Sequence, residues 1–376
     1  MILLSVIELL KKLVEIPSIS PLDLGCQNII GEILVSLGFK VEKILINKTS
    51  NLWAEHGKGK TFTFLGHTDV VPPGNIKNWN SNPFSLRISN NYVFGRGVVD
   101  MKGSIAAMIV AVRDFIFRYP FYKGRITFLI TSDEESTGTD GTVKIVEKLI
   151  QRKEKIDFCL VGEPTSEFIL GDVIKNGRRG SLSAQLIIYG VQGHIAYPHL
   201  FDNPIHKSIL ILQNLIKYDW KDKNEFFPST QLQIYKINSS TNANNVIPGE
   251  LKIEFNVRFN PKTTVSKIKS IISFLLDSSN LKYKLNWKQF SNPFYSKPCK
   301  LIPIVEKSIN SIQKISTQVS TSGGTSDGRF FSNMNSEIVE LGLINKTIHQ
   351  CNERTSISDL KALVLIYKKI ICNLFI

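Results

Sequence analysis

The chain has 376 residues, of which 43% are hydrophobic and 21% charged, and its formal net charge is +14 at pH 7. This length exceeds one small core and favours two domains. No stretch reaches the roughly 18–20 apolar residues of a membrane span, and residues 1–16 lack the features of a secretory signal. We therefore expect a cytoplasmic protein with no membrane partner.

The positive charge raises the question of nucleic-acid binding. The lysines are dispersed among Ile and Asn residues and form neither a basic run nor an aromatic-spaced stripe. We therefore expect no nucleic-acid partner and interpret the charge as a solvated, Lys-rich surface, part of which attracts an anionic substrate. The five cysteines have no CxxC spacing, which argues against a disulfide framework and a zinc ribbon.

The first half of the chain alternates helical and strand-like segments. Residues 1–16 carry apolar side chains at helical spacing and predict an amphipathic surface helix. Near-continuous apolar runs at 61–65, 125–131 and 158–161 predict strands that are covered on both faces. Helical stretches at 104–117 and 142–150 lie between them. This order is typical of an α/β domain.

The pattern changes near Gly177. The next segments read as strand, helix, strand, strand, helix and strand, at residues 182–189, 204–218, 231–237, 251–259, 265–276 and 281–287. That order matches a ferredoxin-like α+β unit. After Pro293 the α/β pattern returns, with a helix at 302–315, a strand at 337–341 and a helix at 357–374. We predict a discontinuous catalytic domain of residues 1–179 and 293–376, interrupted by an inserted domain of residues 180–292.

Five side chains able to bind metal stand just past these segments, one at each: His67, Asp100, Glu135, Glu163 and His349. In open α/β sheets, ligands bind outside the carboxyl ends of the strands. Each residue alone is commonplace, but together they predict an open two-metal site at one edge of the sheet. Imidazole and carboxylate ligands without thiolate suit a hydrolytic zinc, manganese or cobalt site.

Neighbouring residues extend this hypothesis. Asp69 stands two residues after His67, where it can accept a hydrogen bond from the ring nitrogen that does not bind metal. Asp100 precedes a helix whose N-terminal dipole favours a carboxylate, and it can bridge two cations. Glu134 and Glu135 are adjacent, so their side chains point in different directions. One can bind metal while the other takes a proton.

These segments resemble the zinc aminoacylase–carboxypeptidase superfamily of metallopeptidase fold. The resemblance rests on residues 66–69, 95–103 and 133–135 and extends nearly end to end. Residues 175–181, 190–194, 244–250 and 322–330 are similar to the branch that removes succinyl groups, and residues 322–330 differ from the acetylornithine deacetylases. The resemblance implies a mixed-sheet, zinc-exopeptidase-like catalytic domain with an inserted ferredoxin-like dimerisation domain.

The resemblance also implies a role for each matching residue. Asp100 bridges two zinc ions per subunit, with cobalt or manganese as substitutes; His67 and Glu163 hold one ion, and Glu135 and His349 the other. Glu134 is the general base and later the acid, and Asp69 orients His67. The protein is a homodimer in which His194 reaches the partner's active site. Five residues contact substrate carboxylates and amide: Arg178, Asn244, Arg258, Thr325 and Asn345.

The reaction that the resemblance implies is hydrolysis of N-succinyl-LL-2,6-diaminopimelate to succinate and LL-2,6-diaminopimelate, in lysine and meso-diaminopimelate biosynthesis. A related N-acyl amino acid deacylase, such as acetylornithine deacetylase, is the alternative, because the metal residues do not separate the two. From other classes, a nucleic-acid-binding protein leaves the ligand set unexplained. The presence of Glu134 and His194 argues against a metal-binding homologue without catalysis.

Overall fold

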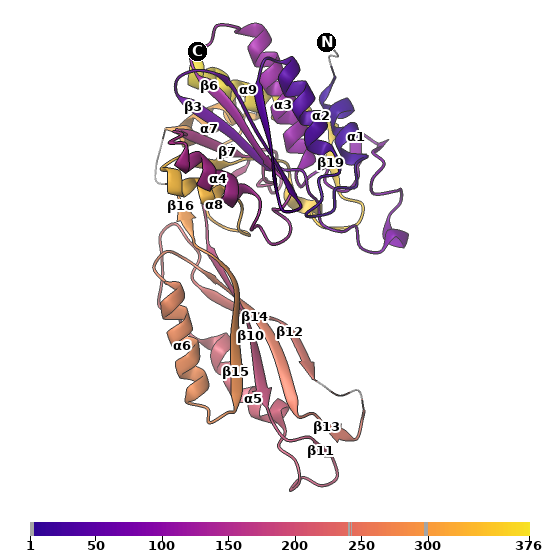
Figure 1. Cartoon of the computed structure of the whole chain (residues 1–376), viewed down its shortest axis with the longest axis vertical. Helices are drawn as coiled ribbons and strands as arrows, with labels where there is room; N and C mark the ends of the chain where they lie inside the picture. Colours follow the sequence, from indigo (N-terminus) through magenta and orange to yellow (C-terminus); the bar gives the residue numbers. More distant parts are fainter. Residues whose placement is uncertain (1–3, 240, 242, 297–299) are drawn as a thin grey trace. The chain divides into compact units, whose positions relative to one another are not determined.

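The computed structural model describes residues 4–239, 241, 243–296 and 300–376. The chain forms two compact units (Figure 1). The first unit comprises Met1–Gly177, Tyr295–Ser320 and Ser326–Ile376, and the second comprises Arg178–Phe294 and Thr321–Thr325. The four described cysteines are free, and Cys299 lies outside the described residues. No helix in the described ranges is long and apolar enough to cross a membrane.

A mixed eight-stranded sheet forms the centre of the first unit, in the order β1-β2-β6-β3-β7-β18-β8-β17. Its strands are β1 (Lys40–Ile46), β2 (Thr49–Gly57), β3 (Thr61–His67), β6 (Arg125–Thr131), β7 (Phe158–Val161), β8 (Val173–Lys175), β17 (Gln318–Ser320) and β18 (Glu337–Glu340). The central strands β6, β3, β7 and β18 run parallel to one another. Strands β1 and β2 are antiparallel additions at one side, and β8 is antiparallel to β18 at the other.

Helices cover both faces of this sheet. They are α1 (Val6–Val14), α2 (Cys26–Ser36), α3 (Lys102–Arg118), α4 (Thr142–Gln151), α7 (Leu301–Gln313), α8 (Gly328–Phe331) and α9 (Ile357–Phe375), with short 3-10 turns η1 (Ile76–Asn78), η2 (Ser332–Met334) and η3 (Asn345–Thr347). A small three-stranded sheet joins β4 (Arg87–Ser89), β5 (Tyr92–Phe94) and β19 (Arg354–Ser356).

The central strands show why the sequence reads as continuous apolar runs. Phe62 and Phe64 of β3 belong to the large core under α1, α3, α7 and α9, while Leu65 is equally buried but lies outside that core. Successive side chains of a strand point to opposite faces. Because helices cover both faces, every position of β3 is buried and no polar alternation survives.

The N-terminal helix forms as its pattern predicts. Ser5 caps α1 in a capping box with Glu8, and the apolar face of the helix, including Leu9 and Leu13, is buried against α3. The first three residues of the predicted segment 1–16 lie outside the described residues.

The second unit is a four-stranded antiparallel sheet with two helices. Its elements are β10 (Gly180–Tyr189), α5 (Pro204–Lys217), β12 (Gln231–Ser239), β14 (Glu250–Phe259), α6 (Val265–Asp277) and β15 (Tyr283–Ser291), with short strands β11 (Gly193–His194) and β13 (Val246–Ile247). The sheet order is β12-β14-β10-β15. The short strands β9 (Gly177–Arg178) and β16 (Phe294–Tyr295) pair where the chain passes between the units.

Buried and partly exposed side chains alternate along the strands of this second sheet, because helices cover only one of its faces. Leu182, Leu186 and Ile188 of β10 are buried in a core with α5 and α6, while the residues between them are partly exposed. The order β-α-β-β-α-β is the predicted ferredoxin-like arrangement.

Candidate metal centre and active site

The predicted metal ligands meet because the strands that precede them are adjacent. Strand β3 lies between β6 and β7 and runs parallel to both, so the carboxyl ends of all three open at one edge of the sheet. His67 is the last residue of β3, Glu135 follows β6, and Glu163 follows β7. Asp100 stands just before α3, and His349 just after η3.

Two histidines face the two oxygens of one carboxylate. His67 Nε2 lies 3.3 Å from Asp100 Oδ1 and 3.5 Å from Glu163 Oε1. His349 Nε2 lies 3.3 Å from Asp100 Oδ2 and 2.9 Å from Glu135 Oε1. Asp100 is therefore shared by two groups of ligand atoms, one on the His67 side and one on the His349 side.

The donor atoms of this cluster fit a cation. The ligand atoms of His67, Asp100 and Glu135 lie within 4.8 Å of one another, as do those of His67, Glu134 and Glu163. His67 Nε2 and Asp100 Oδ1 are buried and have no hydrogen-bond partner among the described residues. Buried polar atoms normally have a partner, so two lone-pair atoms that face each other without one suit a bound cation.

The protonation equilibria of the cluster lead to the same conclusion. Burial and the nearby Asp100 carboxylate raise the pKa of Glu163 to about 7. Burial and the Glu163 carboxylate raise the pKa of Glu134 well above its usual range. Contacts with Asp100 and Glu135 raise the pKa of His349 to about 10. Crowded carboxylates that draw protons onto themselves and their histidines are typical of a site built for cations.

Asp69 forms hydrogen bonds with the backbone N–H groups of Glu134 and Glu135 as well as with the His67 ring. His67 Nδ1 lies 2.9 Å from the Asp69 carbonyl oxygen and 3.5 Å from its carboxylate Oδ1, so the backbone carbonyl, rather than the expected carboxylate, is the nearer acceptor. A proton on Nδ1 leaves the Nε2 lone pair to face the cluster. The carboxylate accepts hydrogen bonds from the Glu135 N–H at 3.0 Å and the Ser20 hydroxyl at 2.6 Å.

A match to known proteins decides the family. The profile of "Peptidase family M20/M25/M40" matches residues 63–373. The chain belongs to this family.

Relatives from two subspecies of one bacterium are similar over nearly their whole length. The chain is 54% identical over 371 residues, 99% of this chain and 98% of the relative, to a protein of Buchnera aphidicola subsp. Baizongia pistaciae (strain Bp). It is 50% identical over 370 residues, 98% of this chain and 99% of the relative, to a protein of Buchnera aphidicola subsp. Acyrthosiphon pisum (strain APS). Both relatives are named succinyl-diaminopimelate desuccinylase.

Solved structures share the fold at low identity. An M20 family metallo-carboxypeptidase from Sulfolobus solfataricus has a TM-score of 0.83 at 19% identity, covering 97% of this chain and 98% of that one. A tripeptidase from Staphylococcus aureus subsp. aureus mu50 has a TM-score of 0.80 at 21% identity, covering 97% and 96%. Membership of the M20 family, together with the donor set, implies that the cluster binds divalent metal.

Two acidic residues that hydrogen-bond to the ligand-bearing loops were not identified as site residues from the sequence. The Asp133 carboxylate accepts hydrogen bonds from the Ser136 hydroxyl and from the Asp140 N–H, which shapes the loop that carries Glu134 and Glu135. Glu353 is fully buried and binds the loop that carries Asp100. The sequence did contain a hint of each residue: Asp133 stands directly before Glu134, and Glu353 stands four positions after His349.

The remaining predicted site residues are divided between the units. Asn345 begins η3 in the first unit, where its N–H donates to the Ser166 carbonyl at 2.8 Å. Five belong to the second unit and are therefore not placed relative to the cluster: Arg178, His194, Asn244, Arg258 and Thr325. His194 is exposed on β11, and Asn244 is exposed in the turn before β13.

The second unit has one buried arginine, Arg178, and two partly buried arginines, Arg179 and Arg258, which lie close to each other. Arg178 is 7% exposed, and its Nη1 donates to the Ser322 carbonyl at 2.9 Å. Arg258 Nη1 is buried and has no hydrogen-bond partner within the described ranges. Burial and the neighbouring Arg179 lower the pKa of Arg258. A guanidinium with an unused buried donor beside a second guanidinium suits an anionic group of a ligand.

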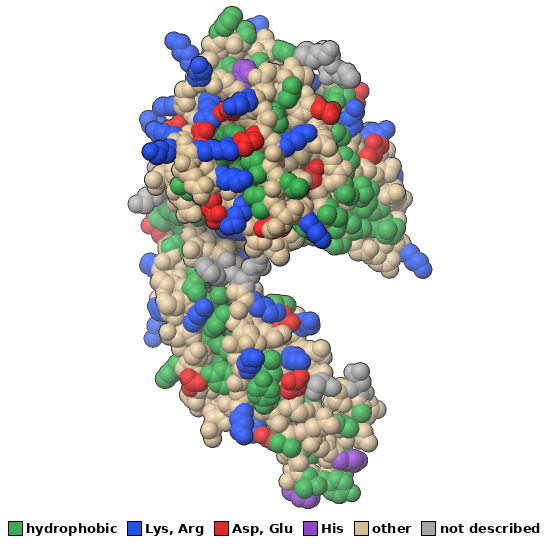
Figure 2. Space-filling view, viewed as in Figure 1, with side chains coloured by type: hydrophobic (Ala, Val, Ile, Leu, Met, Phe, Trp, Pro, Cys, Tyr) green, Lys and Arg blue, Asp and Glu red, His purple; other side chains and the backbone are tan. Residues whose placement is uncertain are grey.

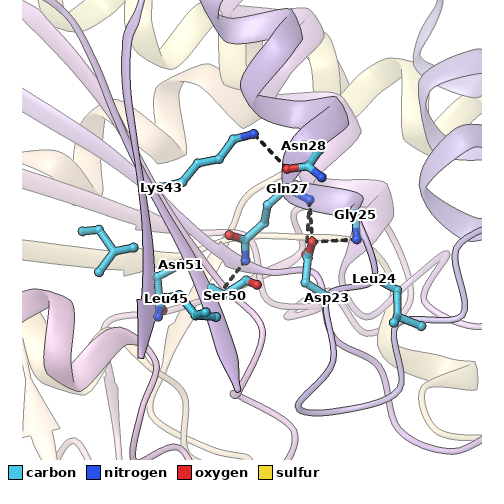
Figure 3. A pocket seen from close by; sticks show the side chains of 10 residues that line it. Asp23, Leu24, Gly25, Gln27, Asn28, Lys43, Leu45, Ser50 and Asn51 are labelled. Atoms are coloured by element: carbon cyan, nitrogen blue, oxygen red, sulfur yellow. Dashed lines mark hydrogen bonds between the residues drawn. The ribbon is translucent and has the colours of Figure 1, made fainter. Parts of the chain in front are cut away.

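A hollow elsewhere on the first unit does not compete with the cluster (Figure 3). The Asp23 carboxylate accepts hydrogen bonds from the N–H groups of Gly25 and Gln27, both at 3.0 Å. It also accepts one from the Thr68 hydroxyl at 2.6 Å. Lys43 donates to Asn28 at 2.8 Å. Both charged side chains of this hollow are engaged, so it offers no reactive pair.

The surface charge is spread widely. Figure 2 shows Lys and Arg side chains distributed over the visible face among acidic and neutral ones, without a single basic stripe. This distribution is what the dispersed lysines of the sequence predict for a solvated surface.

Proposed function

We propose that this chain hydrolyses N-succinyl-LL-2,6-diaminopimelate to succinate and LL-2,6-diaminopimelate, a step in forming lysine and meso-diaminopimelate. The observation that carries this proposal is the 54% identity, over 99% of the chain, to a relative named succinyl-diaminopimelate desuccinylase. The convergent imidazole and carboxylate cluster supports it, because amide hydrolysis is the chemistry of such sites.

The cluster is proposed to hold two zinc ions per subunit, with cobalt or manganese as substitutes. His67 and Glu163 would hold one ion, Glu135 and His349 would hold the other, and Asp100 would supply a ligand oxygen to each. The support is geometric, since each Asp100 oxygen faces a different histidine at 3.3 Å. The bound ions supply Lewis-acid polarisation of the amide carbonyl and activation of water.

Glu134 is proposed as the general base and acid. It takes the proton from the attacking water and later delivers it to the leaving amine. Its place among the ligands supports this role, because its carboxylate lies within 4.8 Å of ligand atoms of His67 and Glu163. Burial also raises the pKa of Glu134, which is the direction in which general acids and bases are tuned.

Selection of a substrate with several carboxylates is proposed to rest on arginines. Arg178 and Arg258 bind carboxylates through their planar forks, and Asn244, Thr325 and Asn345 add hydrogen bonds to carboxylate and amide. The unused buried donor of Arg258 supports this assignment.

The second unit is proposed to form a homodimer. Strand β12 is an edge of its sheet and exposes Tyr235 and Ile237, while α5 exposes Ile209 and Leu210. An apolar edge strand beside an apolar helix face is typical of a surface that another chain covers. In this dimer, His194 of the partner subunit stabilises the oxyanion of the tetrahedral intermediate.

The test uses metal-depleted protein, assayed with N-succinyl-LL-2,6-diaminopimelate and with N-acetylornithine, before and after zinc is restored. We expect zinc-dependent cleavage of the succinyl substrate alone. Cleavage of N-acetylornithine alone would keep the metal chemistry but assign the chain to the acetylornithine deacetylases. Cleavage of neither substrate with zinc bound would overturn the proposed reaction.

A further inference from the structure

Glu353 holds the loop that leads to Asp100. The Glu353 side chain is fully buried, and all four hydrogen bonds recorded for its carboxylate go to residues 96–100. Oε1 accepts from the N–H groups of Val99 at 2.7 Å and Asp100 at 3.1 Å. Oε2 accepts from the N–H of Gly97 at 3.0 Å. One carboxylate therefore fixes the backbone of the shared ligand.

Arg96 joins this carboxylate to the segment that carries His349. Its Nη1 donates to Glu353 Oε2 at 2.8 Å, and its Nη2 lies 3.5 Å from the carbonyl oxygen of His349. The guanidinium also lies over the Trp79 ring, 5.3 Å from its centroid. Arg96 is 1% exposed, so its fork has no competing water. The pair connects Asp100 and His349, although 257 residues separate Arg96 from Glu353.

The two sides of the cluster differ in how their backbone is held. His67 lies within β3, between two parallel neighbours, and Glu163 directly follows β7. His349 lies outside any helix or strand, with φ of +59° and a side chain that is 48% exposed. Its exposed position leaves its placement to local contacts, of which the Arg96 fork is one.

We propose that Arg96 and Glu353 are positioning residues for the His349 side of the metal centre. They set the affinity for the ion of the His349 side most, because they hold both Asp100 and the His349 segment. The His67 side shares Asp100 but changes little, because β3 and β7 hold His67 and Glu163. This inference rests on the proposed two-metal function. It assigns the pair no contact with substrate or with the reacting atoms.

The first experiment titrates cobalt(II) into metal-depleted wild-type protein and a Glu353→Gln variant, followed by visible spectroscopy and calorimetry. The amide nitrogen replaces one carboxylate oxygen, and each oxygen accepts two of the four hydrogen bonds, so two hydrogen bonds are lost. We expect wild type to bind two ions and Glu353→Gln to bind one ion normally and the second about 10- to 100-fold more weakly. A His349→Ala variant should bind cobalt on the His67 side alone. At intermediate cobalt concentrations, the spectrum of Glu353→Gln should match the spectrum of this variant.

Glu154→Gln is the matched control. Glu154 pairs with Arg125 at 2.7 Å, is partly buried in the same unit, and has no recorded contact with either ligand loop. It should bind both ions as wild type does, with a small change in thermal stability.

The outcomes separate this inference from the proposed function. If wild type fails to bind two ions, the two-metal function is wrong. If wild type binds two and Glu353→Gln does so with unchanged affinities, the positioning role is wrong. If Glu353→Gln does not fold, Arg96→Lys decides, because it keeps the charge but loses the fork that reaches His349. A weaker second ion then supports the pair, and unchanged binding overturns it.

Discussion

The candidate metal cluster of the first unit and the arginines of the second unit (Arg178, Arg179 and Arg258) suit ligands of opposite charge. The cluster gathers carboxylates and imidazoles at the edge of a parallel sheet, whereas the second unit places guanidinium groups near the ends of antiparallel strands β10 and β14. A carboxypeptidase and a tripeptidase share the fold at 19% and 21% identity, so the fold alone does not select the substrate. In the proposed function, most of the groups that break the bond belong to the first unit, and the arginines that bind substrate carboxylates belong to the second.

The largest expected effect is a loss of turnover in the first unit, on substitution of the residue proposed to transfer protons rather than to bind metal. Glu134→Ala should retain both ions and lower kcat by about 100- to 10,000-fold, because a general base contributes on that order. Metal content is measured by elemental analysis and kcat by succinate release. Loss of an ion in this variant would instead make Glu134 a ligand. Glu135→Ala is the control and should lose metal.

The second effect tests whether the second unit also takes part in chemistry. His194→Ala should fold, dimerise and bind metal, and its kcat should fall by about 100- to 1,000-fold, the usual cost of losing an oxyanion donor. Mixing it with Glu134→Ala should restore activity through heterodimers that contain one intact site. No restoration, with subunit exchange verified, would contradict a histidine donated by the partner.

The third effect concerns substrate choice. Arg258→Lys should lower kcat/KM for the succinyl substrate by about 10- to 100-fold, because a charged hydrogen bond contributes about 1.5–3 kcal/mol and lysine lacks the fork. Metal binding should not change. Arg152→Lys serves as control, since Arg152 forms an exposed ion pair with Glu42. Equal kcat/KM in both variants would remove Arg258 from substrate binding.

The smallest expected effect concerns the surface of the second unit. Ile209→Lys on α5 should raise the dimer dissociation constant by about 10-fold, because burying a charge at the proposed interface costs more than 1 kcal/mol. Sedimentation at several concentrations measures this. Val35→Lys is the control, because Val35 is also an exposed apolar residue of a helix, 58% exposed, but belongs to the first unit. A dimer unchanged by the α5 substitution would place the interface elsewhere.

The sequence was most informative where local pattern determines structure. The apolar run that ends at His67 predicted its strand, and carboxyl ends of adjacent parallel strands share an edge, so His67, Glu135 and Glu163 were expected to meet. The order of strands and helices from Gly180 to Ser291 likewise predicted the ferredoxin-like unit. Both inferences depend on side-chain periodicity, which short stretches of chain already contain.

Only the tertiary structure decided which backbone groups support the ligands. The hydrogen bonds of Glu353 to the loop before Asp100 join residues 253 or more positions apart. Likewise, the backbone carbonyl of Asp69, rather than its carboxylate, is the nearer acceptor for His67. Periodicity carries no information about such contacts, because they depend on where distant loops meet once both faces of the sheet are packed.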